Sequence, residues 1–421
     1  MTRRPFVAAA AVAAAGLVLQ YAPWPQPWLD AGFMGWWFPR LTRVTARLAA
    51  GVGWSLSAAL LAAWLLGLAL CALAALVGRR RVGLGGGSRR RSGVGTGDVR
   101  RGRHGPWRPF RLALAWPAAL LVTAFPLTFG LAYRVSDLKS AVAERKAGRS
   151  VDPWVAHAGG ESLAYRLVAV LTATAPGAAE DHPVAGAASE PATSATASSV
   201  TGSAADLPAA LRAAAARCVA RTAGALRREF LPATLAPGAR RATAAADAGL
   251  PAVPDRFKTL PAGTLLRGGY AGIVSPWLLE PHVDAGLPAA AGLAVALHEF
   301  AHTAGFAREA EAEAVGLVAG LTCDDPDVRY AAALSLARSL LAAASADEER
   351  EYLAAWPERA RQDARAAEAA ARRYRTPALQ RATDAVYATY LRSQGGSEGL
   401  GEYAGGTALA LALIGGGLAP P

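Results

Sequence analysis

Two long uncharged segments dominate the first third of the chain. Residues 54–77 form a run of 24 residues without a charge, and residues 112–133 form one of 22. A helix of either length crosses the hydrocarbon core of a bilayer, which is about 30 Å thick, and buried helices of soluble proteins are seldom so long and uncharged. We therefore expect two membrane spans. A third apolar segment, at about 6–22, is either another span or a cleaved signal peptide.

The loop between these two spans is strongly basic. Residues 79–111 hold eleven arginines and one acidic residue, which accounts for +10 of the formal net charge of +12. Because the rest of the chain carries only about +2, the charge does not indicate a nucleic-acid-binding protein. Short basic loops stay in the cytoplasm. The sequence therefore predicts that the chain beyond residue 134 lies outside the cytoplasm.

The chain divides into a membrane region, 1–133, and a domain, 134–421. Residues 24–48 mix tryptophans with arginines, which is typical of a segment at the membrane surface, and we expect this segment on the outer side with the domain. Residues 176–205 are of low complexity and are predicted to form a flexible insertion.

Within the domain, the hydrophobic pattern is mostly helical. It predicts helices at about 137–148, 160–173 and 207–230, the last with a solvated face of arginines that includes Arg227. The best strand candidate is 263–279. We therefore predict a mainly α fold with a small β element.

The chain contains three cysteines, too few for a disulfide framework. Cys71 lies in an apolar run, whereas Cys218 and Cys323 both lie in the domain. A single bridge between these two requires an oxidising compartment, and the sequence leaves this question open.

Residues 298–302 read HEFAH. On a helix, His298 and His302 lie one turn apart on the same face, so their imidazoles can converge on one cation. Zinc peptidases use this arrangement because the metal polarises the scissile carbonyl and lowers the pKa of its water to about 7, while a glutamate, here Glu299, takes the proton. The alternative is two surface histidines beside a glutamate, but the pattern arises by chance only on the order of 0.01 times in such a chain.

A third ligand requires the chain to reverse direction. If the helix continued unbroken, Glu309 would lie about 10 Å farther along its axis than His302, too far to share an ion. Gly305 offers a place to turn. A second helix beginning near Arg308 would then bring Glu309 to the metal.

In that second helix, Glu313 would lie one turn behind Glu309 on the same face, and Glu311 would point to solvent. The longer metzincin pattern, HExxHxxGxxH, fails because its last position holds Arg308, which cannot bind zinc.

An HExxH helix followed by a helix with E-x-x-A-[DN] resembles the gluzincin class of zinc peptidases. The resemblance implies a zincin-like domain with Glu309 as the third ligand and Glu313 as the residue that braces a ligand histidine, although a glutamate replaces the usual Asp or Asn.

More narrowly, the chain resembles a family of three-span bacterial membrane proteins of unassigned function. The family pattern HELAHQ-GFAREDEAN appears here as HEFAHTAGFAREAEAE, followed by LTCDDPDVRYAAAL, and the family's P-F-T-G-E element corresponds to residues 276–280. The departures are Thr303, Ala310 and Glu313. The resemblance is best over 255–340, and it implies a multi-pass protein of the bacterial inner membrane.

We therefore expect Zn²⁺, as the single cofactor, to bind His298, His302, Glu309 and a water molecule, with Glu299 as general base. A strand at 270–280 would hold an extended peptide, and Tyr330 is a candidate oxyanion stabiliser, as is Arg329.

The expected partners are a peptide or protein of the cell envelope and the lipid bilayer, with no nucleic acid. The alternative function is a non-catalytic, zinc-stabilised envelope scaffold or receptor. A transport function has little support, because no span carries a charged residue that would mark a polar pathway through the membrane. The other histidines considered, His157, His182 and His282, are isolated in the sequence.

Overall fold

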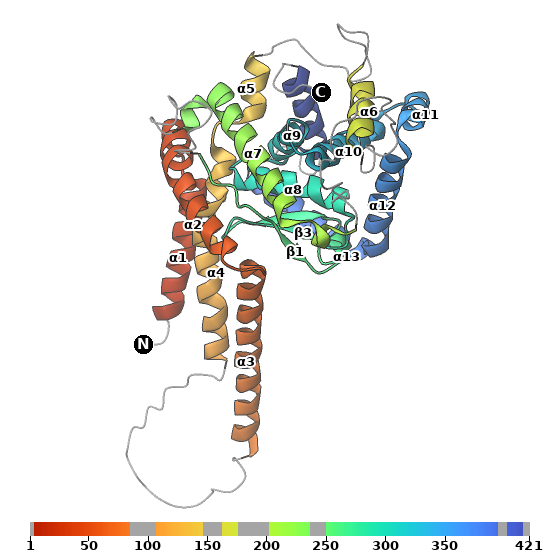
Figure 1. Ribbon diagram of the computed structural model, residues 1–421. Coiled ribbons are helices and arrows are strands. Elements are labelled where there is room, and N and C mark those ends of the chain that lie inside the picture. Colours follow the sequence, from red (N-terminus) through yellow and green to blue (C-terminus); the bar gives the residue numbers. More distant parts are fainter. Residues whose placement is uncertain are drawn as a thin grey trace, which may run out of the picture. The chain divides into compact units, whose positions relative to one another are not determined.

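The computed structural model describes residues 4–84, 107–145, 162–175, 202–235, 250–394 and 402–415 (Figure 1). The chain forms two compact units: one comprises residues 1–23 and 56–128, and the other comprises residues 24–55 and 129–421. Most of the predicted basic loop and of the predicted insertion lies outside the described residues, as do His157 and His182.

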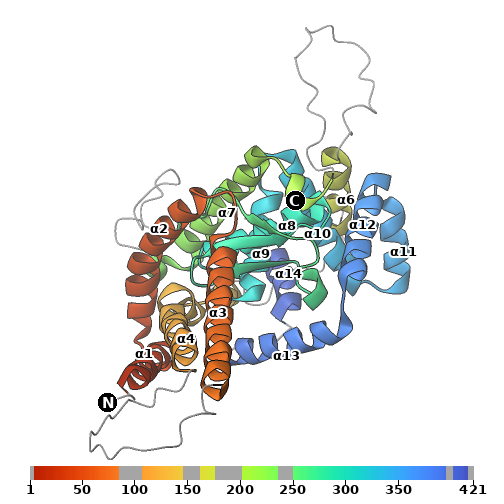
Figure 2. The same ribbon diagram turned by 90° about the horizontal axis from the view of Figure 1, so that it is seen from below.

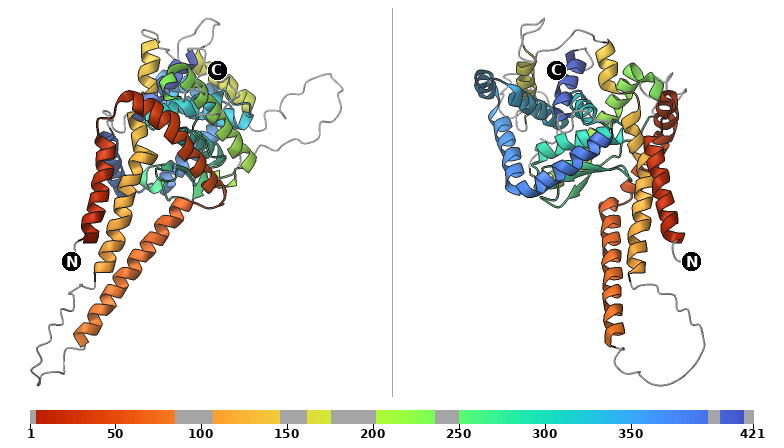
Figure 3. Two further views of the ribbon diagram at one scale, coloured as in Figure 1. Left: turned by 90° about the vertical axis from the view of Figure 1, so that its left-hand side faces the viewer. Right: turned by 180° about the vertical axis from the view of Figure 1, so that it is seen from behind.

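The first unit contains helices α1 (Arg4–Tyr21), α3 (Leu56–Leu84) and α4 (Arg108–Thr128). Each is long and apolar enough to cross a membrane. Helices α1 and α4 lie side by side (Figures 1 and 3). They approach closely because α1 presents Gly16, where a Cβ would lie 2.5 Å from the Cα of Thr123. The Thr123 hydroxyl also donates to the Val12 carbonyl at 2.6 Å, an interhelical hydrogen bond of the kind found in membranes.

The third predicted span is too long at its carboxyl end. Helix α4 ends at Thr128, and a short 3₁₀ helix, η2 (Gly130–Arg134), follows in the second unit. Phe129, Leu131 and Tyr133 are buried there. Residues 129–133 are uncharged because they belong to a protein core, so the predicted boundary at residue 133 is wrong.

The second unit also includes the tryptophan-rich segment. It forms the π-helix η1 (Trp28–Trp37) and helix α2 (Phe38–Ala50). One side of this segment buries Phe33, Met34 and Phe38, whereas Val44 and Leu48 on the other side are exposed. Residues 24–55 thus belong to the same compact unit as residues 129–421. The sequence had included them in the region 1–133, although it also predicted residues 24–48 at the membrane surface beside the domain.

The rest of the second unit is mainly helical, as predicted, with α8, α9 and α10 in its middle, α7 on one side and α11 and α12 on the other (Figure 2). The helices are α5 (Leu138–Arg145), α6 (Leu163–Thr174), α7 (Ala209–Phe230), α8 (Ala289–Thr303), α9 (Glu309–Leu321), α10 (Pro326–Ala343), α11 (Ala346–Ala355), α12 (Glu358–Tyr374), α13 (Pro377–Ser393) and α14 (Glu402–Leu413).

A small sheet lies beside α8. Its strands are β1 (Lys258–Leu260), β2 (Gly272–Ser275) and β3 (Glu280–Asp284), in the order β1-β3-β2. Strand β2 runs antiparallel to β3, with Ile273 opposite His282, and β1 runs parallel to β3. Within the described sheet, β2 is therefore an edge strand with one side unpaired.

The strand predicted at 263–279 is only partly correct. Residues 272–275 are extended, but Leu266–Gly268 form a 3₁₀ turn. Gly263 and Gly269 have φ values of 81° and 86°, a conformation that favours glycine and turns the backbone. The apolar pattern therefore covers two local turns as well as one short strand.

A disulfide joins Cys218 of α7 to Cys323, which lies between α9 and α10. This contact answers the question that the sequence left open. The bridge connects elements that pack around α8, and its two ends are 105 residues apart in the sequence.

Candidate metal centre

The centre is built on two helices joined by a tight reversal. Helix α8 ends at Thr303, and Gly305 follows with φ of 90°. The N–H of Gly305 donates to the His302 carbonyl at 2.9 Å, and that of Phe306 donates to the Ala301 carbonyl at 3.2 Å. These two bonds form a Schellman motif, which ends a helix at a left-handed glycine. The chain turns where the sequence predicts.

Helix α9 begins at Glu309, and the extended residue Arg308 precedes it. This reversal brings one donor atom from each of His298, His302 and Glu309 within 4.8 Å of one another. One oxygen of Glu309, Oε2, lies 3.2 Å from His298 Nε2 and 3.5 Å from His302 Nε2. Two ligands of a tetrahedral zinc ion with bonds of about 2.0–2.1 Å are about 3.4 Å apart, so the separations suit one ion.

The other nitrogen of each imidazole has a fixed partner. His298 Nδ1 lies 3.0 Å from Glu313 Oε2, and His302 Nδ1 lies 2.8 Å from the Phe306 carbonyl oxygen. Partners of this kind orient ligand histidines and assign their tautomers, so both Nε2 atoms are left to face the centre. Glu313 occupies the bracing position that the resemblance implies, whereas the Phe306 carbonyl was not predicted.

Burial and pairing act in opposite directions on the titration of these groups. Burial alone would lower the pKa of His298, but its bonds to Glu309 and Glu313 outweigh burial and raise that pKa well above its usual value. Burial would raise the pKa of Glu309, yet the two histidines hold it well below its usual value. The metal-free centre therefore behaves as a carboxylate paired with an imidazolium.

Glu299 lies beside this group without being one of its three donors. Its side chain is buried, with 5% of its surface exposed, and burial raises the pKa of its carboxyl despite the opposing effect of His298. Strand β2 approaches it closely: a Cβ on Gly272 would lie 2.5 Å from Glu299 Oε1. A glycine is thus needed for β2 to lie against the carboxylate.

Tyrosines of α13 and of the loop before β2 surround the same group. The Tyr387 hydroxyl donates to Glu309 Oε1, and the ring of Tyr270 meets that of Tyr387 edge to face at 5.2 Å. Tyr270 also donates to Asp384 Oδ1 at 3.3 Å. Helix α13 packs against the 3₁₀ turn Leu266–Gly268, where the Thr383 hydroxyl donates to the Gly268 carbonyl at 2.7 Å. Neither tyrosine could be found from the sequence, because nothing in their spacing relates them to HEFAH.

Tyr330, in contrast, does not reach the centre. It is completely buried in α10, and its hydroxyl donates to Asp363 Oδ2 at 2.7 Å. Arg329 donates to the Cys323 carbonyl at 2.6 Å. The prediction that either residue stabilises an oxyanion is therefore wrong, because both side chains belong to helix packing.

Two charged residues assigned to solvent are buried instead. Glu311 accepts a hydrogen bond from the Leu138 N–H at 2.6 Å and lies 3.5 Å from Arg308. Arg227, only 1% exposed, donates to the Ala304 carbonyl at 3.1 Å and lies over the ring of Phe306 at 4.5 Å. The prediction that Glu311 and Arg227 face solvent is therefore wrong. Arg227 supports the turn that positions Glu309.

His282 is not isolated in the fold. Its Nε2 lies 2.7 Å from the Ser55 hydroxyl and 3.3 Å from Glu280 Oε2, and the three side chains are buried. Glu280, the last residue of the element at 276–280, is the first residue of β3. This element supplies no ligand to the group formed by His298, His302 and Glu309.

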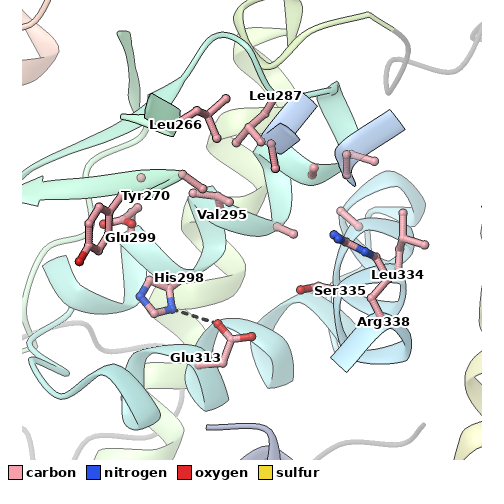
Figure 4. Close-up of a pocket in the computed structure, with 18 of the residues that line it drawn as sticks. Leu266, Tyr270, Leu287, Val295, His298, Glu299, Glu313, Leu334, Ser335 and Arg338 are labelled. Carbon is pink, nitrogen blue, oxygen red and sulfur yellow. Dashed lines mark hydrogen bonds and ion pairs between the residues drawn. The ribbon is translucent and has the colours of Figure 1, made fainter. Parts of the chain in front are cut away.

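A cavity of about 510 Å³ opens beside the centre. Figure 4 shows His298, Glu299 and Tyr270 at one end, with the bond between His298 and Glu313 dashed. Glu299 and His298 both line this cavity.

One comparison with known proteins matches part of the domain. Residues 229–411 match a family described as "Protein of unknown function (DUF3810)". The comparisons with curated proteins and with solved structures gave no match. The matched region contains the sheet and α8 to α13, so it includes the whole candidate centre but assigns it no activity.

Proposed function

We propose that this protein is a membrane-anchored, zinc-dependent metallopeptidase that hydrolyses peptide bonds on the extracytoplasmic side of a bacterial inner membrane. The observation that carries the proposal is the convergence of His298, His302 and Glu309 within 4.8 Å, with Glu299 beside them at the end of an accessible cavity. A purely structural zinc site is usually closed by four protein ligands.

The donor set suits zinc. Two imidazole nitrogens and one carboxylate oxygen are the ligands of many catalytic zinc sites, and both imidazoles are oriented by partners at 3.0 Å and 2.8 Å. A zinc ion held there would act as a Lewis acid on the scissile carbonyl and would lower the pKa of the attacking water.

Glu299 would take the proton from that water and deliver it to the leaving amine. Burial raises the pKa of its carboxyl, and a raised pKa suits a group that first accepts and then donates a proton near neutral pH. We assign the Tyr387 hydroxyl, in place of Tyr330, as the donor to the negative charge that develops on the scissile carbonyl oxygen. Its single proton, donated to Glu309 Oε1 in the substrate-free centre, would turn to that oxygen.

The unpaired side of β2 would hold the substrate. An extended peptide that adds to a sheet edge gains main-chain hydrogen bonds, and β2 lies against Glu299 at Gly272. Added there, the peptide backbone would run past the general base.

Two observations support an extracytoplasmic domain. The loop 79–111 is basic and connects two helices long enough to span. The Cys218–Cys323 disulfide is of a kind that persists in oxidising compartments and is rare in the cytoplasm.

The test uses the full chain, purified in detergent. Bound zinc is measured by elemental analysis, and cleavage of a denatured protein mixture is compared between the wild type, Glu299→Gln and the exposed control Glu358→Gln. We expect one equivalent of zinc in all three proteins and loss of cleavage in Glu299→Gln alone. One equivalent of zinc without any cleavage would favour the scaffold function, and absence of zinc would exclude the site.

A further inference from the structure

The cavity beside the centre is lined mainly by apolar side chains. Its walls come from α8, α10, α12 and the segment before β2. From Ala291 to His298, α8 rises about 10 Å, a distance that an extended peptide of about three residues covers. The apolar wall consists of Leu266, Leu287, Ala290, Ala291, Ala294, Val295, Ala331, Leu334, Ala367 and Ala371.

The charges of the cavity are separated. Glu299 and Glu313 lie nearest His298 in Figure 4, and Asp384 accepts a hydrogen bond from Tyr270 at the same end, whereas Arg338 lies at the opposite end. Ser335 lines the hollow next to His298, and Arg338 follows it by one turn of α10. Arg338 supplies the only guanidinium among the lining residues in the described part of the chain.

The guanidinium of Arg338 has no hydrogen bond or ion pair with another residue in the ranges that the structure describes. The acidic group that acts on it electrostatically is Glu368, whose carboxylate is already bonded to Arg372. Although Arg338 as a whole is exposed, its surroundings desolvate the guanidinium and lower its pKa. A cation in this setting gains from an anionic partner.

We propose that Arg338 binds a carboxylate of the substrate, so that the enzyme selects peptides in which a short apolar stretch separates the cleaved bond from a carboxylate. This inference rests on the proposed peptidase function and names the substrate class of the same site. The carboxylate comes either from the C-terminus of the peptide or from an acidic side chain. A carboxylate bound at Arg338 would lie at the end of the cavity opposite Glu299, so that glutamate would repel it less than it would repel a carboxylate beside His298.

Binding is measured with the zinc-loaded full chain carrying Glu299→Gln, so that no peptide is cleaved. The probes are fluorescein-labelled peptides of four to eight alanines and leucines in three forms: the free acid, the C-terminal amide, and an amide with a glutamate at the last position. We expect at least one carboxylate form to bind about tenfold more tightly than the plain amide, and the free-acid and glutamate forms separate the two sources.

Two further variants show whether Arg338 causes the preference for carboxylate peptides. Arg338→Gln keeps the length of the side chain but removes its charge, so the tenfold preference should disappear. Arg350→Gln removes the same charge at an exposed position of α11 that lines neither this cavity nor the hollow beyond Arg338, so the preference should persist. An equal affinity for acid and amide forms, or a preference that survives Arg338→Gln, overturns the proposal.

Cleavage is measured separately with Glu299 intact. Cleavage without a carboxylate preference overturns this inference and leaves the peptidase function standing. A preference that depends on Arg338, without any cleavage, overturns the peptidase function and leaves the carboxylate site standing. No binding of any peptide overturns both.

Discussion

Glu313 determines how firmly His298 is held. The carboxylate contacts Nδ1 of the imidazole at 3.0 Å, and loss of such a partner typically costs 10–100-fold in metal affinity. We expect Glu313→Ala to lower zinc affinity by about this factor, measured by competition with a chromophoric chelator. The exposed control Glu358→Ala should retain the wild-type affinity. Equal affinities in both variants would show that the contact does not support the metal.

Tyr387 is expected to act on the reaction more than on the metal. Its hydroxyl donates to the Glu309 oxygen that lies away from the two imidazoles, and removal of one donor to a developing oxyanion costs about 10²–10³ in kcat. We expect Tyr387→Phe to lower kcat by about 10² while bound zinc stays at one equivalent.

Tyr390→Phe is the matched control, since its ring stacks on that of Tyr387 at 5.9 Å. It should change kcat much less. If Tyr387→Phe instead loses zinc, the hydroxyl serves to hold Glu309 in place.

At the scale of residues, the sequence was most informative where local geometry decided the outcome. The four-residue spacing of His298 and His302, the need to reverse at Gly305, and the position of Glu309 all follow from helix dimensions. Tyr387 and Phe306 could not be found in this way. A tyrosine from α13 and a backbone carbonyl reach the centre only through the tertiary fold, which the local pattern does not encode.

The reversal between α8 and α9 depends on a glycine. Gly305 has φ of 90°, and a Cβ there would lie 2.9 Å from Arg227 and 3.0 Å from Phe38. A non-glycine residue in this conformation costs about 1–3 kcal/mol, and the close contacts add to this cost. We expect Gly305→Ala to lower the free energy of unfolding by at least about 1–3 kcal/mol and to weaken zinc binding, as measured by thermal unfolding with and without a chelator.

Gly53→Ala is the control, because a Cβ at Gly53 would meet no atom within 4 Å. Its stability should stay close to that of the wild type. A stable Gly305→Ala variant that binds zinc normally would show that the turn tolerates a side chain.

At the scale of elements, helices were easier to predict than the ends of spans or the strands. The helical period of α7 runs over 22 residues, whereas β2 contains only four residues and is preceded by two glycine turns. An uncharged run such as residues 129–133 suits both a membrane span and a protein core. Composition alone could therefore not separate these residues from α4.

The division of the molecule into units could not be read from composition either, as residues 24–55 show. Tryptophans and arginines indicate a membrane surface, and Trp28, Trp36 and Trp37 are exposed. Phe33, Met34 and Phe38 of the same segment are buried in the globular unit. Met34 and Phe38 lie close to Gly305. A fragment that begins at residue 134 would therefore lack side chains that pack beneath the metal-binding turn, which is why each experiment uses the full chain.

The disulfide provides a test of the stability and of the compartment of the domain. Cys218 and Cys323 are 105 residues apart in the sequence, and closing a loop of about 100 residues is expected to stabilise a fold by about 4–5 kcal/mol in the chain-entropy description. We expect the double variant Cys218→Ser, Cys323→Ser to unfold at a lower denaturant concentration than the wild type, followed by tryptophan fluorescence.

Thiol labelling of the wild-type chain, expressed in bacteria and denatured without reductant, tests the side of the membrane. If the domain is extracytoplasmic, only Cys71, which is free, should react with a maleimide of high mass, whereas prior reduction should allow three adducts. Cys71→Ser should then show no adduct without reduction. Three adducts before reduction would place the domain in a reducing compartment, because disulfides are rarely maintained there, and would contradict the orientation that the basic loop predicts.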